Sequence, residues 1–184
     1  MPILYDSLTL LCCFLSLPVG ALENGLARTP PLGWRSWNAY GGGVTQQKME
    51  AVIVAMADRS RMVDGAPTSL HDLGYEFIGL DDGWQACGAG VNGSFHDAAG
   101  RPLIDTAKFP DMKLMVAAAH ARGLKAGWYM NNCICSEHVF EGDAVEAVLT
   151  GSVRALHDLG FDGLKLDSCS QVEHGPRSMY NRCV

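Results

Sequence analysis

Carboxylate and ammonium side chains occur where two apolar stretches of this sequence end. Asp81 and Asp82 follow one stretch, and Lys165 and Asp167 close another. Side chains alternate between the two faces of a strand, so Lys165 and Asp167 are expected on one face and the leucines between and before them on the other. Charged groups that face the interior of a fold need a partner or a polar ligand. The pattern therefore predicts either a site for a polar ligand or a buried Lys–Asp ion pair, and the acids that neighbouring strands deliver to the same rim favour the site.

The adjacent carboxylates of Asp81 and Asp82 allow three interpretations. Two such groups repel each other when both are ionised, and their proximity suits a bidentate grip on ligand hydroxyls or a divalent cation. Solvated acids at the end of a strand are the plainer alternative. No cluster of histidines or further acids nearby completes a metal shell. Hydroxyl recognition is therefore favoured over metal binding, and neither a metal nor a cofactor is predicted.

Aromatic residues accompany these charges. Trp37, Trp84 and Tyr129 supply flat rings at the predicted rim, of the kind that stacks on the apolar face of a sugar, although any one of them alone is more often part of a core.

An internal repeat indicates which elements position these residues. Residues 71–81 (HDLGYEFIGLD) match residues 157–167 (HDLGFDGLKLD), and a looser copy occupies residues 121–129 (ARGLKAGWY). Each copy reads as the end of a helix, a glycine and a strand, because glycine readily adopts the left-handed conformation that ends a helix. We expect helices over residues 46–61, 112–122 and 144–159, the last with Asp143 as its N-cap, and strands over residues 32–34, 75–80, 125–129 and 163–167.

Strands that alternate with helices predict an α/β fold with parallel strands and crossover helices. No glycine-rich phosphate loop follows any of the strands, so a barrel is favoured over an open dinucleotide-binding sheet. An eight-stranded (β/α)8 TIM barrel needs about 250 residues. The four expected strands therefore predict the first half of such a barrel, truncated near its middle.

Composition narrows the class of protein and its location. The chain has 184 residues and a net charge of −6 without any basic cluster, so a nucleic-acid or membrane-surface partner is not expected. The apolar run within residues 8–17, followed by Ala21, predicts a signal peptide over residues 1–21 and a mature domain over residues 22–184. Asn92 heads an Asn-Gly-Ser glycosylation motif. We therefore expect a glycoprotein of the secretory pathway, either secreted or lysosomal/vacuolar, with no membrane association after signal cleavage.

Three strings carry a family resemblance, at residues 26–34 (LARTPPLGW), 80–84 (LDDGW) and 164–169 (LKLDSC). Together they resemble the α-galactosidase (melibiase) family, glycoside hydrolase family 27. The resemblance implies a retaining enzyme in which Asp167 attacks the anomeric carbon of a terminal α-galactosyl unit. It implies substrate-binding roles for a further set of residues, namely Trp37, Asp81, Asp82, Tyr129, Lys165 and Cys169.

The resemblance also sets limits on activity and assembly. It places the companion acid/base on a later strand that this chain does not contain, so negligible turnover is expected from the 184 residues alone. The implied partner is a small or oligomeric α-galactoside, and a homodimer is compatible with the full-length protein. The alternatives are an α-N-acetylgalactosaminidase, a non-catalytic sugar-binding remnant, and an unrelated metal-dependent barrel enzyme that uses Asp81, Asp82 and Asp167.

The resemblance further implies a disulfide between Cys169 and either Cys133 or Cys135. The chain departs from the family pattern at Gly83, where a cysteine is common, and residues 41–43 (GGG) occupy the region of that cysteine's usual partner. This difference removes one disulfide without touching the predicted site.

Overall fold

A computed structural model describes Gly25 and residues 28–131, 135 and 142–167 of the chain. The chain divides into two units, residues 1–30 and 31–184, and the fold given below is that of the second unit. The predicted signal peptide, Cys133 and Cys169 lie outside the described residues.

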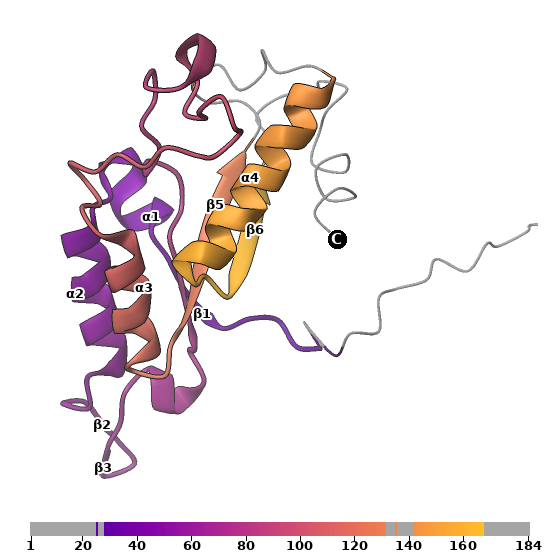
Figure 1. The fold of residues 1–184 in the computed structure, drawn as a ribbon. Coiled ribbons are helices and arrows are strands. Elements are labelled where there is room, and N and C mark those ends of the chain that lie inside the picture. The colour runs from indigo at the N-terminus through magenta and orange to yellow at the C-terminus, as the bar shows by residue number, and fades with distance from the viewer. Residues whose placement is uncertain (1–24, 26–27, 132–134, 136–141, 168–184) are drawn as a thin grey trace, which may run out of the picture. The chain divides into compact units, whose positions relative to one another are not determined.

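A sheet of four parallel strands organises this unit, in the order β1-β4-β5-β6 (Figure 1). The strands are β1 (Gly33–Arg35), β4 (Phe77–Gly79), β5 (Lys125–Asn131) and β6 (Gly163–Asp167). The order follows the chain, as it does in the first half of a (β/α) barrel. The predicted α/β class and the position of every strand are confirmed, and β6 begins and ends where the sequence predicts.

Helices connect the strands. They are α1 (Trp37–Tyr40), α2 (Gln46–Ala57), α3 (Met112–His120) and α4 (Asp143–Leu159). Short 3₁₀ turns form at Gly41–Gly43, His71–Leu73 and Val91–Gly93. The side chains of Thr45 and Asp111 accept hydrogen bonds from Lys48 N and Leu114 N and so begin α2 and α3. Gly74 and Gly160 have φ of 90° and 84°, and this left-handed geometry confirms the helix-ending role that the repeat predicts for them.

The core lies between the outer face of the sheet and the helices. Ile78, Leu80 and Trp128 on the strands are at most 2% exposed and pack with Met49 and Met115 of α2 and α3. The leucines of β6 also contact the core, as the alternation of side chains predicts. The opposite, inner face of the sheet is therefore left to the charged residues.

Two helix ends and one cap differ from the predictions, and the first is that of α3, which ends at His120, two residues before the predicted end. The structure ends α2 at Ala57, four residues before the predicted end, because Asp58 is extended and a two-stranded hairpin follows, β2 (Met62–Val63) with β3 (Ala66–Pro67). The positive φ of Gly65, 81°, turns this hairpin. Asp143 is the first residue of α4 rather than its N-cap, and Gly142 occupies the cap position.

Candidate active site

The register of β5 and β6 places the polar residues of these strands side by side. Tyr129 pairs with Lys165, and Asn131 pairs with Asp167. Residues that are paired in register point to the same face of a sheet. The four side chains therefore share the inner face, at the carboxyl ends of the strands, which is where barrel enzymes carry their active sites.

Lys165 joins the two strand ends that carry carboxylates. Its ammonium lies 2.9 Å from Asp81 Oδ2 and 3.6 Å from Asp167 Oδ2. It also lies 4.9 Å from the centre of the Tyr129 ring, which allows a cation–π contact. The structure thus brings together residues that are 84 positions apart in the sequence. A Lys165–Asp167 ion pair is present, but it is not the buried pair considered from the sequence, because the two side chains are 35% and 43% exposed, and the closer partner of the lysine is Asp81.

Asp81 is almost fully enclosed, with 1% of its surface exposed. Its backbone N–H donates to Ser36 Oγ at 2.9 Å, and its Oδ1 accepts the Asp82 backbone N–H at 3.0 Å. Its Oδ2 receives the Lys165 ammonium. The plainer alternative, a solvated acid at the end of a strand, is therefore wrong for Asp81, because burial, the Asp82 N–H and the Lys165 ammonium hold this carboxylate inside the site.

Asp82 is half-buried and begins the loop after β4. Its Oδ1 accepts the Gly83 backbone N–H at 2.8 Å. Burial raises the pKa of the Asp82 carboxyl above its usual value, and the charges of Asp81 and Asp167 act in the same direction. The carboxylate therefore stands in a crowded acidic environment, where a hydroxyl donor from a ligand is favourable.

The hydroxyl of Tyr129 orients the predicted nucleophile. It donates to Asp167 Oδ2 at 3.1 Å and accepts from Asn131 Nδ2 at 3.1 Å. Burial raises the pKa of this phenol well above its ordinary value, so Tyr129 remains a hydrogen-bond donor at any physiological pH. The Asp167 carboxylate therefore has two neighbours, a phenol and an ammonium, that hold it in one place.

Arg35 is a member of the site that the sequence analysis missed. Its Nη1 donates to Leu80 O at 3.1 Å and lies 3.7 Å from Asp81 Oδ2. The guanidinium lies over two glycines, because a Cβ added at Gly79 would meet it at 2.7 Å and one added at Gly127 at 3.3 Å. Burial lowers the pKa of Arg35, while Asp81 opposes this shift. Gly79 and Gly127 are paired in register on β4 and β5. A glycine within each of two predicted strands was the available signal, since such glycines leave room for one long side chain.

Comparison with known proteins assigns the family. A model of the protein family described as Alpha galactosidase A matches residues 29–181 of the chain. The chain belongs to this family. It is 34% identical over 157 residues to the α-N-acetylgalactosaminidase of Gallus gallus, covering 80% of this chain and 35% of that protein. It is 31% identical over 161 residues to the α-galactosidase of Cyamopsis tetragonoloba, covering 86% of this chain and 34% of that protein.

Solved structures agree with this assignment. The α-galactosidase I of Mortierella vinacea superposes with a TM-score of 0.65 at 30% identity, over 87% of this chain and 36% of that structure. The chain thus spans about a third of the length of the relatives that it matches. The resemblance to family 27 and to part of its TIM barrel, predicted from the three strings, is confirmed.

In this member of the α-galactosidase family, the two tryptophans predicted at the rim differ in their exposure to solvent. Trp37 lies on α1 and is 48% exposed, so its ring is accessible to a ligand. Trp84 is fully buried and packs against Trp128, with ring centres 4.8 Å apart and the ring planes tilted by 60°, while its Nε1 donates to Tyr129 O at 3.1 Å. The prediction of Trp84 as a rim platform is therefore wrong, because the loop turns this side chain into the core below the site.

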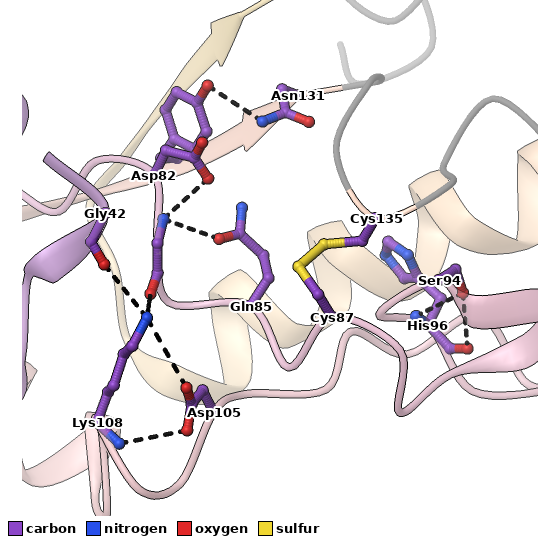
Figure 2. The surroundings of a disulfide bond; sticks show 12 residues. Gly42, Asp82, Gln85, Cys87, Ser94, His96, Asp105, Lys108, Asn131 and Cys135 are labelled. Carbon is purple, nitrogen blue, oxygen red and sulfur yellow. Dashed lines mark hydrogen bonds and ion pairs between the residues drawn. A yellow bond between two sulfur atoms is a disulfide. The ribbon is translucent and has the colours of Figure 1, made fainter.

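The disulfide prediction needs a correction at Cys135. The structure links Cys135 to Cys87, with a Cα–Cα distance of 5.0 Å, and so joins the segment after β5 to the loop after β4 (Figure 2). The predicted alternative of Cys135 with Cys169 is wrong, because a cysteine forms only one such bond. The other alternative, Cys133 with Cys169, stays a prediction for residues outside the described part of the chain, as does a substrate-binding role for Cys169.

The part of the chain that the structure describes contains neither a cluster of metal ligands nor a membrane-spanning helix. No group of three or more His, Cys, Asp or Glu side chains in this part of the chain could hold a metal ion. The cation between Asp81 and Asp167 is the Lys165 ammonium. No helix among the same residues is long and apolar enough to cross a membrane.

Proposed function

We propose that this chain supplies the first half of the catalytic barrel of a retaining glycoside hydrolase that removes terminal α-galactosyl units. The observation that carries the proposal is the Lys165 ammonium between Asp81 and Asp167, at 2.9 and 3.6 Å. It links two carboxylates on the inner face of the sheet, where a barrel enzyme binds its substrate. Membership of a family that contains α-galactosidases supports the same reaction class.

The proposed chemistry assigns roles to five of the described residues. The Asp167 carboxylate attacks the anomeric carbon, the bond to the leaving oxygen breaks, and a covalent galactosyl ester forms. Tyr129 and Lys165 hold the attacking group in place before the reaction. Asp82 and the Lys165 ammonium bind ring hydroxyls, and Trp37 offers an aromatic face to the sugar. The acid/base that protonates the leaving oxygen is expected from outside this chain.

A fluoride leaving group tests the nucleophile without that acid/base. Fluoride departs from α-galactosyl fluoride with little need of a proton, so the first step should proceed and the second, which needs a base, should stall. We expect one equivalent of fluoride and a stable galactosyl adduct on Asp167, seen by intact-mass and peptide-mass spectrometry. Asp167→Asn should form no adduct. Asp64→Asn is the matched control, since asparagine tolerates the positive φ of this exposed turn residue and should leave the adduct unchanged.

Two other outcomes of this experiment would redirect the assignment. A folded chain that binds galactose by calorimetry and forms no adduct would favour a sugar-binding protein without catalysis. Continuous fluoride release would contradict the expected need for a second carboxyl group.

An α-N-acetylgalactosaminidase is the second candidate function. The 34% identity to the Gallus gallus enzyme of that name favours it. Calorimetric titrations with galactose and with N-acetylgalactosamine distinguish the two. Tighter binding of galactose is expected, and tighter binding of the acetamido sugar would move the proposal to the second candidate.

The secretory pathway, the glycan and the oligomeric state of the protein can each be tested. We infer a secretory pathway from the apolar leader and from Asn92, which lies exposed in the Val91–Gly93 turn. Expression in a secreting eukaryotic host should give a glycan that Asn92→Gln removes. Size-exclusion chromatography tests whether the full-length protein forms the homodimer that the resemblance allows.

A further inference from the structure

Three segments meet beside Asp82, at the rim of the proposed sugar site. They are the triglycine turn Gly41–Gly43, the loop that begins at Asp82, and the stretch from Asp105 to Lys108 (Figure 2). The loop and the turn lie in direct backbone contact, because a Cβ added at Gly83 would meet Gly42 Cα at 2.8 Å. Gly83 also has φ of 108°, a conformation that side chains disfavour. The contact therefore depends on the absence of a side chain at Gly83.

One ammonium holds this contact together. Lys108 Nζ lies 3.2 Å from Gly42 O and 3.1 Å from Gly83 O, and it is 3.9 Å from Asp105 Oδ2. Hydrogen bonds from a charged donor are stronger than neutral ones. The lysine is itself anchored, since its backbone carbonyl accepts the Gln46 N–H at 2.9 Å and its backbone N–H donates to Asp105 O at 3.1 Å. Both ends of this side chain are thus fixed.

Lys108 holds the residue that orients Asp82, which is Gly83. The Gly83 N–H donates to Asp82 Oδ1 at 2.8 Å and to Gln85 Oε1 at 3.0 Å, while the Gly83 carbonyl accepts from Lys108. These two groups belong to the peptides on either side of one Cα, and glycine has no side chain that could anchor it. The hydrogen bond to Lys108 and the backbone contact with Gly42 therefore limit the movement of Gly83, and with it the N–H that Asp82 accepts.

We propose that Lys108 is a positioning residue for Asp82, acting as a non-covalent clamp that fixes the Asp82–Gly83 loop against the triglycine turn. The effect on sugar binding rests on the proposed function, in which Asp82 binds a ring hydroxyl. The effect on the loop does not. Without the ammonium the two carbonyls lose their shared donor, the loop separates from the turn, and the Gly83 N–H leaves Asp82.

The test compares variants of the whole chain by two independent readouts. The first is the hydrogen-exchange rate of the Gly83 amide, measured by NMR on the 19.8 kDa protein. Lys108→Met should raise this rate about tenfold or more, since the clamp limits the opening of this loop. Lys108→Arg, which can also donate to two carbonyls, should restore most of the protection. Lys113→Met is the matched control, because this exposed lysine lies on the neighbouring α3 and should change nothing.

The second readout is galactose affinity and its dependence on pH. Lys108→Met should weaken binding about tenfold and should move the loss of binding in acid to higher pH, because the Gly83 N–H that lowers the pKa of Asp82 is released. The other groups that shift Asp82 through space, Asp81 and Asp167, are unchanged in the variant. Lys108→Arg should return both quantities toward the wild-type values.

Each outcome decides one of the two proposals. Unchanged exchange at Gly83 in Lys108→Met would overturn the clamp. Faster exchange at Gly83 together with no galactose binding by any variant, the wild type included, would support the clamp and refute the sugar site. If Lys108→Met does not fold, Lys108→Gln, which keeps one shorter donor, takes its place with the same expectations. Loss of folding in both would also overturn the proposal, because a positioning residue leaves the fold intact.

Discussion

Arg35 and Lys165 reach the same oxygen of Asp81 from the two outer strands of the sheet. Arg35 Nη1 comes from β1 and lies 3.7 Å from Asp81 Oδ2, while Lys165 Nζ comes from β6 and lies 2.9 Å from it. The carboxylate is 1% exposed, and an enclosed charge of this kind is costly without cations nearby. Strands β1 and β6 are therefore linked electrostatically through Asp81, which follows the inner strand β4.

Arg35→Met should weaken this linkage and lower the free energy of unfolding by about 1–3 kcal/mol, since a buried carboxylate loses one of its two cations. Urea denaturation measures the change. Arg122→Met serves as the control, because the Arg122 side chain is exposed just after α3 and bonds only to Ala118 O among the described interactions. It should alter stability by about 0.5 kcal/mol or less. Equal effects of the two substitutions would contradict the role of Arg35.

The raised pKa of Asp82 predicts that the free energy of unfolding falls as pH rises. Its pKa is raised in the folded state, mainly by burial, so the folded form holds its proton more tightly than the unfolded chain does. Ionisation above the usual carboxyl pKa of 3.8 therefore disfavours folding, and the cost grows until the raised pKa is passed. Asp82→Asn should remove this decline, which thermal melts from pH 3.5 upward would detect. A steeper decline in the variant would refute the argument.

Asp72 gives the opposite sign and serves as an internal comparison. The hydrogen bonds from the Arg59 guanidinium and from Ser69 lower the pKa of Asp72 well below its usual range. Its contribution is therefore present above pH 3.8 and is lost as pH falls. Asp72→Asn should therefore reduce the pH dependence of stability below pH 3.8. Asp82→Asn should instead reduce it above pH 3.8.

Gly83 and Gly42 predict different responses to the same substitution, although they touch each other. Gly83→Ala places a Cβ 2.8 Å from Gly42 Cα at a φ of 108°, so we expect a loss of about 2 kcal/mol or more in unfolding free energy. Gly42→Ala meets nothing within 4 Å and should be nearly neutral. Chemical denaturation of both variants checks this contrast, and comparable losses would show that the backbone contact is wrong.

The Cys87–Cys135 bond predicts a specific cross-linked peptide. Proteolysis without reduction should yield a fragment that joins the segments of these two cysteines, which are 48 residues apart. Cys87→Ser should remove this fragment and cost about 2–4 kcal/mol of stability, because the open loop gains entropy in the unfolded chain. A fragment joining Cys135 to Cys169 would instead restore the alternative that the structure rejects.

Much of the fold follows from periodic features of the sequence. The repeated helix end, glycine and strand identify β4, β5 and β6, because these features depend only on neighbouring residues. The end of α2 does not follow, since Arg59 leaves the helix to bond Asp72, 13 residues away. The turn at Asp64-Gly65 was a local signal for the hairpin that the helical pattern concealed.

The site was predictable where it depends on strand ends and unpredictable where it depends on loop packing. Asp81, Tyr129, Lys165 and Asp167 converge because parallel strands align their carboxyl ends. The burial of Trp84 and the partner of Cys135 depend instead on the path of the loop after β4. Such a path is set by contacts between distant segments, which no local pattern records.

One side chain covers part of the row of glycines on the inner face of the sheet. Gly79, Gly127 and Gly163 lie in one row across the strands, and Arg35 is the fourth member of that row. Its guanidinium lies over Gly79 and Gly127. Under the proposed function, exchange of this arginine for a short residue would uncover these glycines beneath the sugar, and exchange for a bulky apolar one would place a hydrophobic surface there. A single codon would thus set both the shape and the polarity of this part of the proposed site, which offers evolution a direct way to alter which sugars fit.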